Sequence, residues 1–176
     1  MLAGKNLRLI PLAAEHLAKT RQWANDLELN AGILRVLPVT EYDQEQWYAN
    51  LCRDSSRIVF AVHLLETDAH IGNCGFYHID YLHRRGELWL LIGEKSCQGK
   101  GYGQEIVKLM LSFGFDSLNL NRIFLHVRED HIPAIKLYQT IGLQNEGALR
   151  EHYFLQGQYV NVLTMSILRN EYDATK

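Results

Sequence analysis

The chain has 176 residues, 47% of them apolar, and a net charge of −2 at pH 7. This length and apolar content fit one compact domain over residues 1–176. The charge gives no basic patch for nucleic acid, and no apolar run approaches the roughly 20 residues of a membrane span, so neither partner is expected. Three scattered cysteines without a Cys-x-x-Cys pair favour reduced thiols and hence the cytoplasm.

The first half of the chain predicts a strand, two helices and two further strands. Residues 6–10 predict the first strand, and residues 13–25 predict a helix whose turns are marked by Leu17, Thr20, Arg21 and Trp23. A second helix is predicted from the capping-box spacing of Asp43 and Gln46, just before Trp47. Residues 58–65 and 71–81 then predict two strands joined by a polar turn.

A continuous apolar run at residues 88–92 is followed by the glycine-rich turn QGKGYG and by apolar residues at helical spacing as far as Leu118. This pattern predicts a central strand covered on both faces, a tight turn and a long helix. The first amides of a helix lack partners and carry partial positive charge, so the turn predicts an anion site to which Lys100 adds a cation. The glycine spacing fits neither a Walker loop nor the dinucleotide fingerprint.

The last third of the chain predicts a strand at residues 122–127 and a helix at 132–141, which Pro133 opens and Gly142 ends. Strands follow at residues 144–155 and 159–168, joined at 156–158, and the polar tail is expected to fray. The predicted order of elements is βααβββαβαββ, an α/β (α+β) arrangement.

Three segments resemble one known family. The loop Gln98-x-x-Gly101-x-Gly103, set between a strand and a helix, resembles the pyrophosphate loop of the GNAT family of acetyl-CoA-dependent N-acetyltransferases. Residues 131–143, HIPAIKLYQTIGL, are similar to the family segment N-x-x-A-I-x-L-Y-x-x-x-G-F, with His131 in place of Asn. Residues 146–168 resemble the closing hairpin of the branch that holds ribosomal-protein N-terminal acetylases and spermidine acetylases, with Asn161 where Asp is frequent.

The resemblance implies a GNAT fold, in which a mixed, mostly antiparallel sheet contains a parallel central strand pair. It also implies acetyl-CoA as co-substrate and direct acetyl transfer to a primary amine. The acceptor stays open between a protein N-terminus, a polyamine and another small amine. Transfer to an amino sugar or nucleotide sugar, a non-catalytic CoA-binding module, and assembly as a homodimer also remain open. The implied cofactor-binding residues are Leu91, Ile92, Gly93, Gln98, Gly99, Lys100, Gly101, Tyr102, Gly103 and His131.

Amide formation requires a base and an acid. An amine with a pKa of roughly 10 must lose a proton before it attacks, which costs on the order of 4 kcal/mol at pH 7. Glu87, eleven residues before Gln98, is the predicted base, and a solvated turn charge is the alternative interpretation. His126 and His78 are held in reserve. In the resembling family the tyrosine at the position of Tyr138 faces the cofactor sulfur, so Tyr138 is the predicted acid and a core tyrosine is the alternative.

Two other chemistries find little support, and the acceptor side gives one clue. Cys97 has no histidine near it in sequence, which disfavours an acyl-carrying nucleophile. The eight histidines show no His-Glu-x-x-His or cysteine-pair spacing, so no metal is predicted. Residues 26–45 carry five acidic residues against Arg35 alone, which predicts either an acidic wall that steers a cationic amine or ordinary helix caps.

Overall fold

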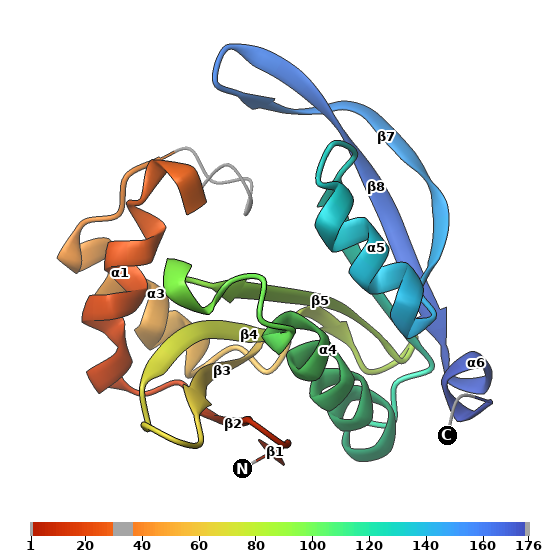
Figure 1. The fold of residues 1–176 in the computed structure, drawn as a ribbon, viewed down its shortest axis with the longest axis horizontal. Coiled ribbons are helices and arrows are strands. Elements are labelled where there is room, and N and C mark those ends of the chain that lie inside the picture. Colours follow the sequence, from red (N-terminus) through yellow and green to blue (C-terminus); the bar gives the residue numbers. More distant parts are fainter. Residues whose placement is uncertain (1, 30–36, 175–176) are drawn as a thin grey trace.

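The computed structural model describes residues 2–29 and 37–174 (Figure 1). Its framework is one sheet with the strand order β1-β2-β3-β4-β5-β6-β8-β7. The strands are β1 (Leu2–Ala3), β2 (Leu7–Pro11), β3 (Ile58–Leu64), β4 (His70–Asp80), β5 (Arg85–Ile92), β6 (Arg122–Arg128), β7 (Gln144–Leu155) and β8 (Gln158–Leu168). Neighbouring strands run antiparallel except β5 and β6, which pair in parallel. The predicted mixed sheet with a parallel central pair is therefore confirmed.

Helices cover the two faces of this sheet unequally. The helical segments are η1 (Ala14–His16), α1 (Leu17–Ala24), α3 (Glu41–Leu51), η2 (Lys95–Cys97), α4 (Tyr102–Ser112), the π turn η3 (Phe113–Ser117), α5 (Ile132–Ile141) and α6 (Arg169–Asp173). Side chains of α4 and α5 belong to the large hydrophobic cluster on one face, which we call the cofactor face. Side chains of α1 and α3 join a smaller cluster on the opposite face, which we call the acceptor face.

The central strand β5 is covered less completely than its apolar sequence predicts. Leu88 is buried in the large cluster, but residues 89–92 are only half-buried. The cause is the pairing of β5 with β6, which extends only from Arg85 opposite Arg122 to Glu87 opposite Phe124. Beyond Glu87 the two parallel strands are no longer paired, so the second half of β5 borders an opening in the sheet. The prediction of a strand covered on both faces is wrong for this half.

The start of α3 and the end of the chain also differ from prediction. Helix α3 begins at Glu41, where the Thr40 hydroxyl accepts a hydrogen bond from Asp43 N (3.1 Å) and the Asp43 carboxylate accepts one from Thr40 N (3.1 Å). The capping box is thus Thr40-x-x-Asp43, and Asp43 lies inside the helix that it was predicted to cap. The polar tail forms α6, because Glu171 Oε2 accepts a hydrogen bond from Leu168 N (2.8 Å).

The helix α5 has the predicted bounds and the predicted ends. Pro133 lies in its first turn, and Gly142 follows its last residue with a left-handed φ of 106°.

Among the residues that the structure describes, no helix has the length and apolar character needed to cross a bilayer.

Candidate active site

The loop before α4 offers free backbone donors to an anion. Gly101 caps the helix in a left-handed conformation (φ 83°), and no side chain caps it. The Gln104 amide bonds back to the Gly101 carbonyl at 3.1 Å, whereas no described residue accepts from the amides of Tyr102 and Gly103. Since these amides lie at a helix N-terminus, they can meet a negatively charged phosphate.

Other residues of the loop fix its shape. Gln98 Nε2 donates to the carbonyl of Ile92 at 2.9 Å and so ties the loop to the end of β5. Gly99 has a left-handed φ of 72°, and Lys100 is exposed beside it. A Cβ on Gly103 would lie 3.2 Å from Leu137 Cδ1, so this glycine lets α4 approach α5 closely. The predicted cofactor-binding residues 98–103 thus form one continuous turn at the start of α4.

Only one of the three predicted cofactor-binding residues on and just after β5 directs its N–H into the opening. Gly93 N donates to the carbonyl of Ile71 at 2.9 Å, so its amide is already engaged by β4. In an antiparallel pair, backbone groups alternate between the two sides of a strand, which directs the Leu91 amide toward β4 as well. The Ile92 amide therefore faces away from β4, on the side where its carbonyl receives Gln98. The Ile92 N–H is therefore directed toward a ligand in the opening, as its predicted role in cofactor binding requires.

Tyr138 lies on α5, on the cofactor face of the sheet. Its side chain packs against the large cluster, and burial raises its pKa to about 12. The hydroxyl therefore stays protonated at neutral pH, and no described residue forms a hydrogen bond with it. Complete proton transfer to a thiolate with a pKa near 8.5 would cost about 5 kcal/mol at that value. Tyr138 is thus suited to donate a hydrogen bond to the leaving sulfur.

Glu87 lies at the centre of a group of histidines on the acceptor face. Its Oε1 atom is 2.8 Å from His126 Nδ1, and its Oε2 atom is 3.6 Å from His78 Nε2. Glu87 is 22% exposed and His126 is 26% exposed, so the pair is largely withdrawn from water. The structure brings together the predicted base and both reserve histidines. Glu87 is not the solvated turn charge that the alternative interpretation described.

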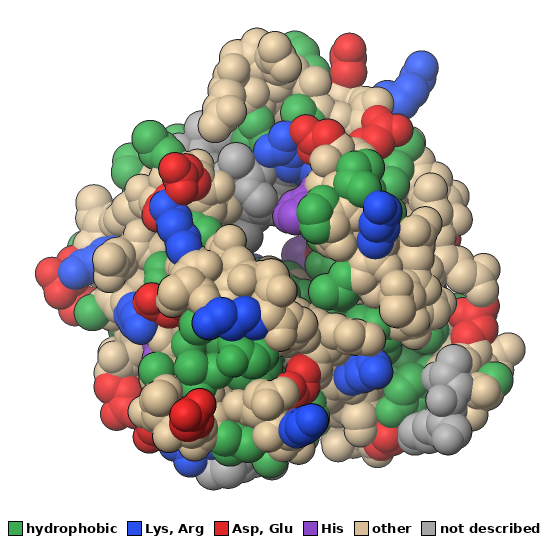
Figure 2. Space-filling model, viewed as in Figure 1, with side chains coloured by type: hydrophobic (Ala, Val, Ile, Leu, Met, Phe, Trp, Pro, Cys, Tyr) green, Lys and Arg blue, Asp and Glu red, His purple; other side chains and the backbone are tan. Residues whose placement is uncertain are grey.

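Strand alternation separates the predicted acid from the predicted base. On β6, Ile123 and Leu125 point into the large cluster, and His126 points to the opposite face. Tyr138 and the Glu87–His126 pair thus lie on opposite faces of the sheet. Figure 2 shows histidine side chains at the opening in the middle of the molecule. The arrangement suits a ligand that reaches an acceptor through the sheet.

His131 is not part of this group. It precedes α5 and is exposed, and its carbonyl accepts hydrogen bonds from the amides of Ala134 and Ile135 at 3.1 Å. Its ring makes no capping bond to the helix. Its predicted contact with the cofactor stays a prediction.

Sequence reasoning missed His152. Its ring stacks on that of His126 with a centroid distance of 6.4 Å and an interplanar angle of 27°. His152 lies on β7, at a register shift between Leu149 and Tyr153, and the Glu151 amide at this shift donates to Asn161 Oδ1 at 2.8 Å. The irregular pairing changes the face of the sheet to which the side chains of this segment point, so strand alternation alone does not predict the position of His152.

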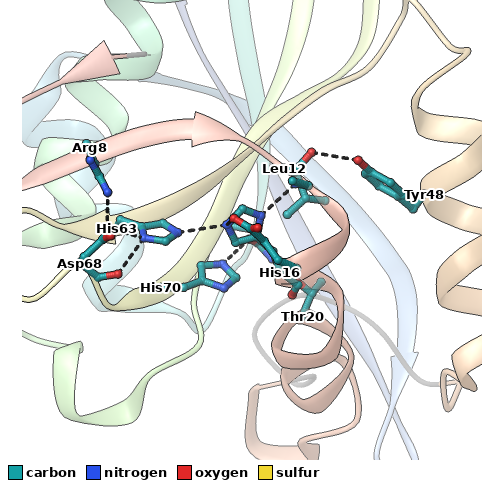
Figure 3. Close-up of polar contacts among 11 residues, drawn as sticks. Arg8, Leu12, His16, Thr20, Tyr48, His63, Asp68 and His70 are labelled. Atoms are coloured by element: carbon teal, nitrogen blue, oxygen red, sulfur yellow. Dashed lines mark hydrogen bonds and ion pairs between the residues drawn. The ribbon is translucent and has the colours of Figure 1, made fainter.

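A second group of histidines, also missed, lies beneath α1 (Figure 3). His16, His63 and His70 are each at most 9% exposed, and they come from η1, β3 and β4. His16 Nε2 lies 3.2 Å from His63 Nε2, and His70 Nε2 lies 2.9 Å from Asn73 Oδ1. Because these residues join the helical wall of the acceptor face to the sheet, we call them the wall histidines.

The hydrogen bonds of the wall histidines fix their protons. Ala13 N donates to His16 Nδ1 at 2.9 Å, so the proton of neutral His16 must be on Nε2, from which it is donated to His63. The proton of His63 is then on Nδ1, 3.0 Å from Asp68 Oδ1. Desolvation by burial lowers the pKa of His16 and lowers that of His70 to about 4. His16 and His70 are therefore neutral at physiological pH.

The acidic residues of segment 26–45 are mostly engaged. Lys95 Nζ lies 2.5 Å from Glu28 Oε2 and 3.1 Å from Asp26 Oδ2, and the Lys95 side chain lowers the pKa of Asp26. Arg21 pairs with Glu41 at 3.3 Å, and the Asp43 carboxylate accepts a hydrogen bond from Thr40 N in the capping box of α3. Arg35 lies outside the described residues. These contacts weaken the predicted acidic wall and favour the alternative of pairing and capping.

The remaining nucleophile and metal interpretations gain no support from the geometry. Cys97 is buried, and its Sγ atom has Ser96 Oγ as a distant polar neighbour at 4.0 Å. Among the described residues, no group of three or more histidine, cysteine and acidic side chains is arranged to hold a metal ion.

Comparisons with known proteins agree with this geometry. The acetyltransferase (GNAT) domain family matches residues 6–144. The chain is 34% identical over 143 residues to the uncharacterized N-acetyltransferase p20 of Bacillus licheniformis, covering 79% of this chain and 80% of that protein. It is 30% identical over 177 residues to the spermidine N(1)-acetyltransferase of Escherichia coli K12, covering 98% of this chain and 91% of that protein.

Solved structures extend the likeness to the fold. The crystal structure of spermidine N-acetyltransferase from Vibrio cholerae in complex with CoA and spermine superposes with a TM-score of 0.92 at 28% identity, covering 96% of this chain and 99% of that one. A dodecameric structure of the same enzyme superposes with a TM-score of 0.84, covering 96% of this chain and 97% of that one. The match of the family over most of the chain, with this fold and this loop, shows that the chain belongs to the GNAT family of N-acetyltransferases.

Proposed function

We propose that this enzyme transfers the acetyl group of acetyl-CoA to a primary amine of a polyamine. The observation that carries the proposal is the Glu87–His126 pair, which lies on the acceptor face where β5 and β6 separate. A cationic amine is attracted to this carboxylate, and the pair supplies the proton acceptor that amide formation needs.

The cofactor would occupy the cofactor face. We assign its pyrophosphate to the turn at residues 98–103, where helix-start amides and Lys100 provide positive charge. The thioester would then reach the opening between β5 and β6, with the Ile92 amide directed at the thioester oxygen and the Tyr138 hydroxyl at the sulfur. This path places the acetyl carbon between the two faces, within reach of an amine from the acceptor side.

The relatives support a polyamine over the other acceptors. The Escherichia coli relative, which aligns over 98% of this chain, is a spermidine N(1)-acetyltransferase. The Vibrio cholerae enzyme was crystallised with both CoA and spermine. Neither a peptide binding groove nor a sugar site is needed to explain the contacts around Glu87.

The test is an acceptor panel with purified enzyme and acetyl-CoA, in which release of the CoA thiol is measured. Spermidine and spermine should give the highest kcat/KM, and glucosamine 6-phosphate and N-terminal peptides should give rates near background. A preference for peptides or amino sugars would replace the polyamine assignment. Tight CoA binding by calorimetry without thiol release for any amine would indicate a binding module.

We also propose that the protein self-associates. Strand β7 lies at the edge of the sheet and is exposed over almost all of its 12 residues. A long exposed edge strand offers unpaired backbone groups to another chain. The dodecamer of the Vibrio cholerae relative supports assembly. Light scattering after gel filtration should give a mass well above 20.3 kDa, and a monomer mass would refute the proposal.

A further inference from the structure

We propose that His126 is the group that accepts the proton of the amine, and that Glu87 is a positioning residue that holds its ring. The inference deepens the proposed function and rests on it. It divides between two residues a role that the sequence alone assigns to Glu87.

The hydrogen bond between the two residues fixes the tautomer of His126. An ionised carboxylate can only accept, so the 2.8 Å contact to Glu87 Oε1 requires a proton on His126 Nδ1. Neutral His126 then has its lone pair on Nε2, which no described residue occupies. The free nitrogen is therefore in the form that can take a proton.

The strand register places His126 nearer to the opening than Glu87. Glu87 lies opposite Phe124, in the last pair that joins β5 to β6. His126 is two residues farther along β6 on the same face, where β5 no longer borders it. An amine that meets a thioester in the opening would reach the His126 ring before it reached the Glu87 carboxylate.

The charged and titratable groups that face the pair are histidines from three strands. Glu87 faces histidines from β4, β6 and β7, namely His78, His126 and, behind His126, His152. The ring of Phe124 meets His126 edge-on at 5.8 Å. No described lysine or arginine forms an ion pair with Glu87, so its negative charge is available to stabilise a positive ring.

The proton balance is complete with these residues. The ammonium group gives one proton to His126 Nε2, and the neutral amine attacks the thioester carbon to form the new C–N bond. As the C–S bond breaks, the second nitrogen proton ends on the sulfur, to which Tyr138 donates a hydrogen bond. The proton on His126 passes to water, for which the exposed His78 and His152 provide a route. The products are the amide, the CoA thiol and one proton.

The test compares His126→Asn, Glu87→Gln and the double variant. Asparagine keeps an N–H donor for Glu87 but cannot accept a proton. His126→Asn should lower kcat/KM at neutral pH by about 10²-fold and recover activity as the pH rises toward the amine pKa of roughly 10. Glu87→Gln should lose about tenfold, and the double variant should fall no further than His126→Asn, because the residues act as one unit. The exposed His83 supplies the control, since His83→Asn should give a pH profile parallel to the parent.

Each outcome decides between distinct claims. If Glu87→Gln loses about 10²-fold while His126→Asn stays within a few-fold of the parent, Glu87 accepts the proton and the inference falls, but the proposed function stands. If the parent acetylates no amine, the proposed function falls. The inference still has its own readout, because ¹⁵N NMR should show His126 protonated on Nδ1 in the parent and altered in Glu87→Gln. The opposite tautomer would overturn it without any turnover.

Discussion

Acidification should destabilise this protein through His70, a buried wall histidine. Burial lowers the pKa of His70 to about 4 in the folded state, against an ordinary value of 6.5. Between these values the unfolded chain binds more protons than the folded chain, so stability is complete above pH 6.5 and is lost as the pH falls toward 4. The two pKa values correspond to a loss of about 2 kcal/mol at pH 5 and about 3 kcal/mol well below pH 4.

Neighbouring groups that also titrate contribute to the pH dependence of the unfolding free energy, and their contribution must be separated from that of His70. Its Nε2 atom bonds to Asn73, its carbonyl accepts from Lys19 Nζ, and the rings of His16 and His63 lie 4.9 Å and 5.3 Å away. The pKa of His16 is lowered by burial and by His63, so His16 adds a loss of the same sign. A variant at position 70 alone leaves this contribution in both proteins, and the difference isolates His70.

The assay is urea unfolding at pH 7.5 and pH 5 for the parent and for His70→Gln, which can still donate to Asn73 but does not titrate. Between the two pH values the parent should lose about 2 kcal/mol more unfolding free energy than His70→Gln. The exposed His83 gives the control, since His83→Gln should follow the parent. Equal losses in the parent and in His70→Gln would refute the argument, because His70 would then not be held neutral by folding.

Three further predictions test the loop, the acid and a helix cap. Gly101 and Gly157 share a φ of 83°, and both have open space at Cβ. The variants Gly101→Val and Gly157→Val should therefore each lose about 1–2 kcal/mol of unfolding free energy. Only Gly101→Val should also weaken CoA binding, measured by calorimetry. Equal CoA affinity in the two variants would remove the loop from the cofactor site. Tyr138→Phe should keep its affinity for acetyl-CoA and lose about 10²-fold in kcat, and a turnover near that of the parent would return Tyr138 to the core. Thr40→Ala should lower the unfolding free energy by about 1 kcal/mol through loss of the cap, measured by urea unfolding, whereas an unchanged midpoint would show that α3 is held by packing alone.

The sequence by itself determined the order of the elements from β2 to β8 and the position of the glycine-rich loop, but not β1 or α6. These features depend on local patterns, such as the apolar run of β5, the glycines at residues 99, 101 and 103, and the Pro133 and Gly142 that bound α5. Local patterns act through backbone conformation and nearby hydrogen bonds, which a sequence displays directly. The sequence predicts a capping box at Asp43 and Gln46, whereas the folded chain forms it at Thr40 and Asp43, so only the structure decided where α3 begins.

The tertiary structure alone decided which side chains meet. Glu87, His126 and His152 are 39 and 26 residues apart along the chain, and their meeting depends on the parallel register of β5 and β6 and on the irregular pairing of β7. The wall histidines likewise come from a 3₁₀ turn and two strands. Strand register and bulges are set by the packing of the whole sheet, not by the residues that they bring together. For that reason the sequence could name Glu87 and His126 as candidates, and only the fold could show that they form one pair.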